Sequence, residues 1–230
     1  MIKAGIDQDA IAALFSRATA RQGDALRQAV CEATLKALQG RELTLENMRR
    51  VLKAVGIASS NGVADNPARA ATQRSLLSHA VQGMDAAMLT AVQANRTALQ
   101  QFMDLGVGLQ SEQMKLALAN LEKMEDLFVG VLGQVTQASA DGLTGPWTKV
   151  LQAVRQDGTR AGTQASLVVA QLIAKSQLAL RTGRSANVRA AQAMMDSYGS
   201  LVSGVLMGMS EALTRAAAAP PKPPARGKAR

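Results

Sequence analysis

Aromatic residues are nearly absent from this chain, whose 230 residues include three Phe, one Trp and one Tyr beside 11 Met. Strands favour aromatic and β-branched side chains, whereas Ala, Leu, Met, Gln, Arg and Lys enter helices at little cost in free energy. The hydrophobic fraction of 47% and the charged fraction of 19% are ordinary for a folded chain. The composition therefore predicts an all-α protein.

The chain also has very few of the side chains on which catalysis and metal binding depend. Cys31 is its only cysteine and His79 its only histidine, which excludes an intramolecular disulfide and a zinc site built from His pairs or Cys clusters of one chain. Cys31 lies in an apolar helical pattern without an adjacent basic residue, so we interpret it as a core residue and not as a nucleophile. We interpret His79 as a residue of a helix surface or interface.

Carboxylates cluster at Glu122, Glu125 and Asp126, but they share their turn with Lys123. A solvated helix face explains this cluster better than an acid/base pair does. The glycines form neither a G-x-G-x-x-G motif after a strand nor a phosphate-binding loop. We therefore expect no enzymatic activity, no cofactor and no metal.

Long hydrophobic runs are missing as well. A membrane-spanning helix needs about 20 mostly apolar residues, and the longest uncharged stretches, among them residues 161–174 and 197–210, have 14 each. The first ten residues, MIKAGIDQDA, contain no apolar segment of the kind found in signal peptides. These observations predict a cytoplasmic protein that does not cross a membrane.

Positive charge is confined to one part of the chain. Residues 1–141 hold 14 Lys/Arg and 14 Asp/Glu, whereas residues 142–230 hold 12 Lys/Arg and three Asp/Glu, which accounts for the whole net charge of +9. The second part is also rich in Ala, Gly, Ser and Thr. This pattern predicts helices that pack closely beside a basic tail.

The N-terminal segment, residues 1–60, reads as a short helical hairpin. Apolar residues recur at helical spacing over residues 9–38, with a break expected near Gly23, and Gly40 ends the pattern. Thr44 can cap a second helix over residues 45–55. The following residues 56–67, GIASSNGVADNP, have the composition of a loop.

Residues 61–138 predict a long antiparallel helix pair. Apolar residues from Val81 to Leu109 follow a nearly heptad spacing, and Ser111 can cap a second long helix that reaches Val135. Helices of this length predict an elongated bundle. Asn95 interrupts the first seam, either to fix register and partner number or because the seam is partly hydrated there. The many Met residues indicate core filling more than an adaptable binding surface.

The C-terminal part divides into three expected segments. Residues 139–146, SADGLTGP, read as a linker, and residues 147–217 as a basic pair of helices rich in small residues. Within that pair, G-x-x-x-G motifs indicate close approach of helix backbones at Gly158, Gly162, Gly204 and Gly208. Residues 218–230 hold four prolines and should be a disordered tail.

The tail carries basic residues and no acidic residue. Such a segment can contact nucleic acid or an anionic surface without sequence specificity, or it can serve only to keep the protein in solution. Its four basic residues are Lys222, Arg226, Lys228 and Arg230.

Two resemblances follow from these patterns. The amphipathic helices over residues 81–230 and the tail PPKPPARGKAR resemble the phasins, small helical proteins that coat polyhydroxyalkanoate storage granules in bacteria. The segments ALQGRELTLENMRRVLKAV and LANLEKMEDLFVGVL, residues 37–55 and 118–132, resemble an uncharacterised bacterial family of all-helical proteins. The phasin resemblance implies binding to an apolar granule surface and a location on storage granules.

The sequence thus supports two hypotheses of different classes. In the first, the protein is a non-enzymatic, phasin-like binder of an apolar surface, with the helices of residues 81–213 supplying the apolar face. In the second, it is a coiled-coil scaffold that associates with another copy of itself or with a helical partner. We also expect a homo-oligomer, as the second hypothesis requires.

Overall fold

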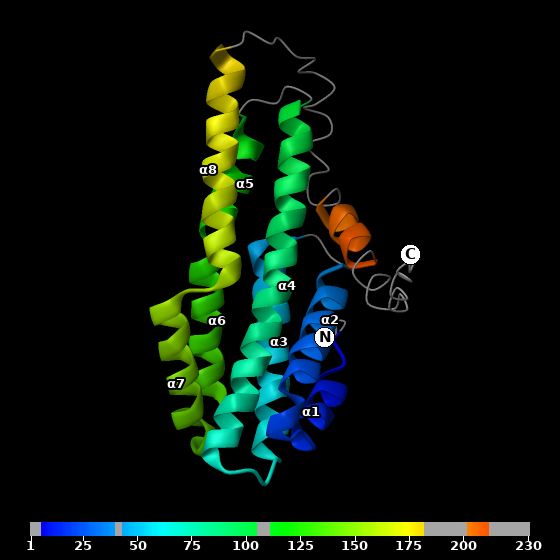
Figure 1. Ribbon diagram of the computed structural model, residues 1–230, viewed down its shortest axis with the longest axis vertical. Helices are drawn as coiled ribbons and strands as arrows, with labels where there is room; N and C mark the ends of the chain where they lie inside the picture. Colours follow the sequence, from blue (N-terminus) through cyan, green and yellow to red (C-terminus); the bar gives the residue numbers. More distant parts are fainter. Residues whose placement is uncertain (1–5, 40–42, 105–110, 182–201, 212–230) are drawn as a thin grey trace, which may run out of the picture.

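The computed structural model describes residues 6–39, 43–104, 111–181 and 202–211, and every regular element in these ranges is a helix (Figure 1). The helices in chain order are α1 (Gln8–Ser16), the 3-10 turn η1 (Ala20–Gln22), α2 (Gly23–Gln39), α3 (Leu45–Ala64), α4 (Ala70–Asp104), α5 (Glu112–Glu122), α6 (Met124–Ala138), α7 (Asp141–Asp157) and α8 (Arg160–Arg181). Residues 202–211 are helical too. The all-α prediction is confirmed, whereas the tail at 218–230 lies outside the described residues.

The helices form an elongated bundle around an antiparallel pair, α3 and α4 (Figure 1). With 35 residues, α4 is about 52 Å long at 1.5 Å per residue and runs through most of the molecule. Helices α1 and α2 pack against one side of this pair and α6 and α7 against another, while α8 and α5 lie together along the second half of α4.

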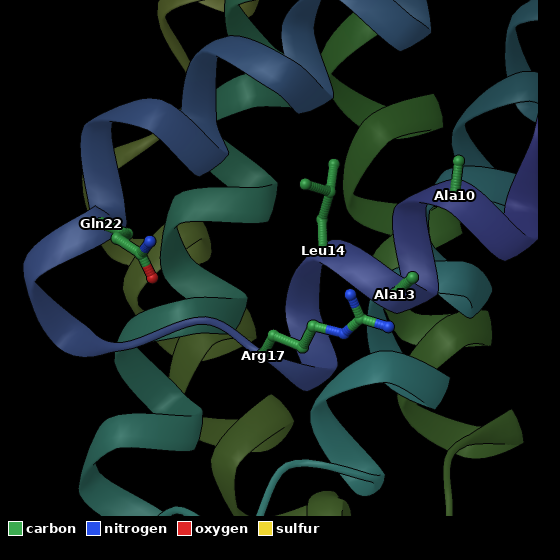
Figure 2. Close-up of a pocket in the computed structure, with 5 residues that line it drawn as sticks. All are labelled: Ala10, Ala13, Leu14, Arg17 and Gln22. Carbon is green, nitrogen blue, oxygen red and sulfur yellow. The ribbon is translucent and has the colours of Figure 1, made fainter.

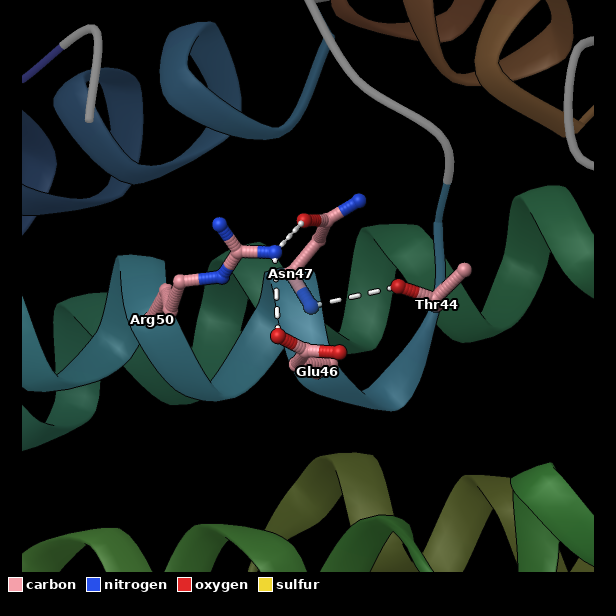
Figure 3. A network of polar contacts seen from close by, with 4 residues as sticks. All are labelled: Thr44, Glu46, Asn47 and Arg50. Atoms are coloured by element: carbon pink, nitrogen blue, oxygen red, sulfur yellow. Dashed lines mark hydrogen bonds and ion pairs between the residues drawn. The ribbon is translucent and has the colours of Figure 1, made fainter. Parts of the chain in front are cut away.

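Local capping explains where several helices begin. The hydroxyl of Thr44 accepts the backbone N–H of Asn47 at 3.2 Å, and Ser111 accepts that of Met114 at 3.3 Å. Such side chains satisfy N–H groups that have no partner inside the helix. Both caps were predicted from the sequence and are confirmed. Figure 3 shows the first turn of α3, where exposed Arg50 contacts both Glu46 and Asn47.

One continuous core connects all parts of the described chain. It extends in sequence from Ile11 to Leu206 and includes residues of every helix from α1 to α8. The predicted seam of α4 is buried against helices of the same chain, as are most of the described methionines, which confirms their core-filling role. The fully buried seam residues are Met84, Met88, Val92 and Leu99.

The segment expected to be a loop, residues 56–67, is mostly helical, because α3 continues to Ala64. Its small residues serve close packing and not a turn. A side chain on Gly56 would lie 2.7 Å from Val135 of α6, and one on Gly62 would collide with the Ala12 carbonyl of α1. Ser59 and Ser60 bond to backbone carbonyls four residues earlier, so their hydroxyls are compatible with helix.

Helix boundaries also differ from expectation in the C-terminal half. The linker predicted at residues 139–146 is wrong beyond Ala140, because α7 begins at Asp141 and includes Pro146 near its start. The expected long helix after Ser111 is divided at Lys123 into α5 and α6. Near the N-terminus the chain leaves the helix after Ser16, before the break expected near Gly23.

Two glycine substitutions should shift stability in opposite directions. Gly62→Ala should lower the free energy of unfolding by about 1–3 kcal/mol, since the new methyl group meets the Ala12 backbone and Phe15. Gly130→Ala on α6 should raise it by about 0.5–1 kcal/mol, because no described atom lies within 4 Å of the added carbon and alanine favours the helix. Urea denaturation monitored by circular dichroism measures both; equal shifts would contradict the packing of α1 on α3.

Candidate functional site

Exposed apolar side chains are concentrated on α5 and α8. Leu167, Ile173 and Leu178 of α8 are 51%, 40% and 62% exposed, and Leu116 of α5 is 63% exposed. These two helices pack against each other at the same end of the bundle (Figure 1). The remaining large exposed hydrophobic residues of the described chain, Leu14 and Met207, lie on other helices.

Helix α8 is apolar on two opposite sides. Its inner side is buried in the core at Ala161, Ala165, Val168 and Leu172. Its other side carries a second line of apolar residues at helical spacing, which we call the α8 outer stripe: Leu167, Ala170, Ala174 and Leu178, all exposed. Polar residues such as Gln171 lie beside this line, but exposed apolar residues that gather on one surface are typical of interaction sites. The outer stripe is therefore a candidate binding surface.

The charges on α8 are all positive. Its sequence, residues 160–181, contains Arg160, Lys175 and Arg181 and no acidic residue. Arg160 is exposed at the start of the helix, whereas Lys175 donates to Asp104 of α4 at 2.6 Å. The outer stripe therefore presents apolar side chains without a nearby carboxylate on its own helix.

The start of α8 is held by a carboxylate from α4. The two oxygens of Asp85 accept the backbone N–H groups of Arg160 and Ala161 at 3.1 and 3.0 Å. Asp85 is 8% exposed, and this loss of water raises its pKa, an effect that the two hydrogen bonds oppose. The negative charge of Glu125 raises the pKa of Asp85 further.

A second carboxylate, from α6, completes this arrangement. Glu125 accepts the backbone N–H of Thr159 at 3.1 Å and also its hydroxyl. The Thr159 oxygen in turn accepts the N–H of Gly162 at 2.9 Å, and a side chain on Gly162 would collide with Glu125. We call Asp85, Glu125 and Thr159 the α8 clamp.

The clamp corrects one interpretation of the sequence. Glu122 and Asp126 are exposed, as expected of a solvated face, but Glu125 is half-buried and bound to Thr159, so the prediction is wrong for that residue. Sequence reasoning missed Asp85 entirely. The available signal was Gly158 followed by Thr159, a helix end followed by a capping residue.

Asn95 is buried in α4 at 6% exposure, and its side-chain amide donates to the Ala91 carbonyl at 2.8 Å. This bond within α4 satisfies part of the hydrogen-bonding capacity of the Asn95 side chain. A role in fixing register or partner number stays a prediction.

The four glycines of the predicted packing motifs have different surroundings. Gly158 ends α7 and is exposed, whereas Gly162 leaves room for the Glu125 side chain where α8 contacts α6. Gly204 and Gly208 have no described atom within 4 Å of an added carbon, so their predicted close approach does not occur within the described chain. Contact with a second chain stays a prediction. The four basic residues of the tail lie outside the described residues.

Cys31 and His79, the single thiol and the single imidazole of the chain, lie in different surroundings. Cys31 packs on the core, and burial raises the pKa of its thiol, which disfavours the reactive thiolate. Half-buried His79 lies against Gly23, and its Nδ1 atom has no hydrogen-bond partner among the described residues. Across the described ranges, no three His, Cys, Asp or Glu residues are grouped as metal ligands would be.

A hollow of about 410 Å³ lies along α1 and the turn after it. Figure 2 shows that its polar side chains, Arg17 and Gln22, do not converge on a common point. The open hollow therefore lacks the convergent polar groups of a small-molecule site.

None of the described helices has a stretch long and apolar enough to pass through a bilayer.

A family model with the description "family of unknown function (DUF6781)" matches residues 1–215. No curated protein and no solved structure matches the chain. The match confirms the resemblance to an uncharacterised family, while the resemblance to phasins stays a prediction.

Proposed function

The chain belongs to the family of unknown function DUF6781, and we propose that it acts without catalysis, as a phasin-like protein that binds an apolar surface. The observation that supports this proposal is the exposed apolar outer stripe of α8, a helix that packs against α5 with its exposed Leu116. Contiguous exposed apolar residues are typical of interaction sites. A polyhydroxyalkanoate granule is the surface that the phasin resemblance suggests.

The binding face proposed here is smaller than the one expected from the sequence. The seams of α4 and α6 cannot supply it in the folded chain, because Met84, Met88 and Phe128 are at most 2% exposed. Residues 142–230 carry a net positive charge, which attracts anionic groups and repels a second copy of the same residues. The charge therefore favours binding to an apolar surface that carries anionic groups. The outer stripe would lie on the surface with Arg160 at its edge.

Replacing two leucines of the outer stripe tests this function. Leu167→Gln with Leu178→Gln should weaken binding about 10- to 30-fold, since each side chain is about half-exposed and loses roughly 1 kcal/mol of burial. The measurement is co-sedimentation with polyhydroxybutyrate granules over a range of granule concentrations.

Leu14→Gln is the matched control, because Leu14 is 48% exposed and lies on α1, away from α8. This variant should bind within about twofold of the original protein. Equal binding by all three proteins would contradict a role for the outer stripe, and failure of the original protein to sediment at low and physiological salt would contradict the function itself.

A self-associating scaffold is the second candidate. It is favoured by the helical segment 202–211, where Gly204 and Gly208 are exposed beside Met207. Small residues at this spacing allow two helices to approach closely. Light scattering separates the candidates: a stable oligomer that binds little apolar dye supports the scaffold, and a monomer that binds much dye supports surface binding.

A further inference from the structure

We propose that α8 opens as a unit about Gly158, and that the α8 clamp sets how often it opens and so regulates the binding of an apolar surface. This inference rests on the proposed function, because it concerns the helix that carries the outer stripe. Three features support it: the conformation of the connection between α7 and α8, the firm anchoring of α7, and the kind of contact that holds α8.

The connection has the properties of a hinge. Gly158 has φ 71° and ψ −176°, a conformation essentially restricted to glycine, and it is the only described residue with a positive φ. It is exposed, and an added carbon there would meet only the Glu125 carboxylate, at 3.9 Å. Rotation of the backbone at Gly158 therefore breaks almost no packing contacts of Gly158 itself.

The helix before the hinge is firmly held. Trp147 of α7 is fully buried and its indole N–H donates to the Ser60 hydroxyl of α3 at 2.9 Å. Leu143 and Val150 are buried beside it. Helix α7 is thus fixed on α3, α4 and α6 and can serve as the stationary side of the hinge.

The first turns of the helix after the hinge are held by small side chains and by the clamp, whereas Val168, Val169 and Leu172 pack on the core farther along. Near its start the buried residues of α8 are Ala161, Gly162 and Ala165, which bury little apolar area. Asp85 and Glu125 provide four hydrogen bonds there, and they come from two different helices. Opening would return both carboxylates to water, which offsets part of the cost of breaking these bonds.

Opening would enlarge the apolar surface of α8. In the closed form Val168 and Leu172 are buried in the core, and the outer stripe is the accessible apolar side. In the open form both sides become available to an apolar surface, along with the parts of α4 and α5 that α8 covers. A surface that binds the open form better shifts the equilibrium toward it.

Hydrogen exchange of the full chain, read by mass spectrometry, tests the opening. In the original protein, amides of α8 should exchange before those of α3 and α4, which stay protected until the whole chain unfolds. In the variant Asp85→Ala with Glu125→Ala, amides of α8 should exchange at least about 30-fold faster and remain less protected than those of α3 and α4. Glu122→Ala with Asp126→Ala is the matched control: it removes two carboxylates that are exposed and outside the clamp, and should leave α8 unchanged. Unchanged exchange in α8 of the variant, or equal protection of α4 and α8 amides in the original protein, would overturn the hinge.

A second variant and a binding measurement complete the test. Asp85→Asn with Glu125→Gln keeps the side-chain shapes in case the alanine variant does not fold. It should also accelerate α8 exchange and leave α8 less protected than α3 and α4. Both clamp variants should bind polyhydroxybutyrate granules at least about threefold more tightly than the original protein. Faster α8 exchange with unchanged granule binding would overturn the regulatory role. If no variant and not even the original protein bound granules, the proposed function would be rejected. The hinge itself is decided by the exchange data alone.

Discussion

Trp147→Ala should lower the free energy of unfolding by about 3–5 kcal/mol, the range measured when large buried aromatic side chains are removed. Trp147 is fully buried between α7 and the α3–α4 pair, and its indole N–H bonds to Ser60, 87 residues earlier in the sequence. The variant loses apolar burial, leaves a cavity and frees the Ser60 hydroxyl. Urea denaturation followed by circular dichroism measures the loss.

Ser60→Ala separates the hydrogen bond from the packing. It keeps the indole in place but leaves the buried N–H without its acceptor, which should cost about 1–3 kcal/mol. The Ser60 hydroxyl also lies 3.2 Å from that of Ser139, so some of this cost reflects the second contact. A loss below 1 kcal/mol for Trp147→Ala would contradict the placement of α7, because only an exposed side chain could be removed at so small a cost.

The helices that sequence reasoning predicted well are those whose signals are local. Thr44 and Ser111 cap helices where predicted because a cap depends on a hydroxyl and an N–H three residues apart. The α4 seam from Val81 to Phe102 is buried as predicted, because helical periodicity alone determines which residues share a face. Such features need no knowledge of the neighbouring helices.

The errors occurred where a small residue has two physical uses. Gly56 and Gly62 suggested a loop, yet each lies where another helix backbone or side chain comes close to α3. Glycine permits both a turn and a close contact, and its neighbours in sequence do not distinguish them. Pro146 likewise suggested a linker but is the sixth residue of α7.

The candidate site was predictable only in part. The inner face of α8 follows from helical spacing alone, and its residues Ala161, Val168 and Leu172 are buried. The clamp was not predictable, because Asp85 and Glu125 lie 75 and 34 residues before the amides that they bind. A carboxylate in an otherwise apolar helix face has several explanations until its partner is located in space.

Asp85→Ala should lower the free energy of unfolding by about 2–4 kcal/mol. The substitution removes the acceptor of two N–H groups, one of them the buried amide of Ala161. A buried donor without a partner costs about 1–3 kcal/mol, and hydrogen bonds to charged groups are the stronger ones. Asp85→Asn keeps one acceptor oxygen and should cost less. A smaller loss for alanine than for asparagine would contradict the observed bonds.

The pH dependence of the Asp85→Asn comparison follows from the direction of the pKa shift. Loss of water raises the pKa of Asp85 in the folded chain above its ordinary value of 3.8, and the negative charge of Glu125 raises it further. The two N–H groups and the positive charge of Arg160 lower this pKa but do not cancel the rise. The folded chain therefore holds this proton more tightly than the unfolded chain does. The contribution to stability is fully present below pH 3.8 and is lost as pH rises through the folded pKa.

The difference in unfolding free energy between the original protein and Asp85→Asn should accordingly fall as pH rises from 4 and then become constant, because asparagine does not titrate. Urea denaturation of both proteins at several values between about pH 4 and pH 8 measures it, and groups outside the clamp cancel in the difference. A difference that grows with pH would mean that the two N–H groups outweigh the loss of water, and that ionised Asp85 fastens α8 more strongly than its neutral form.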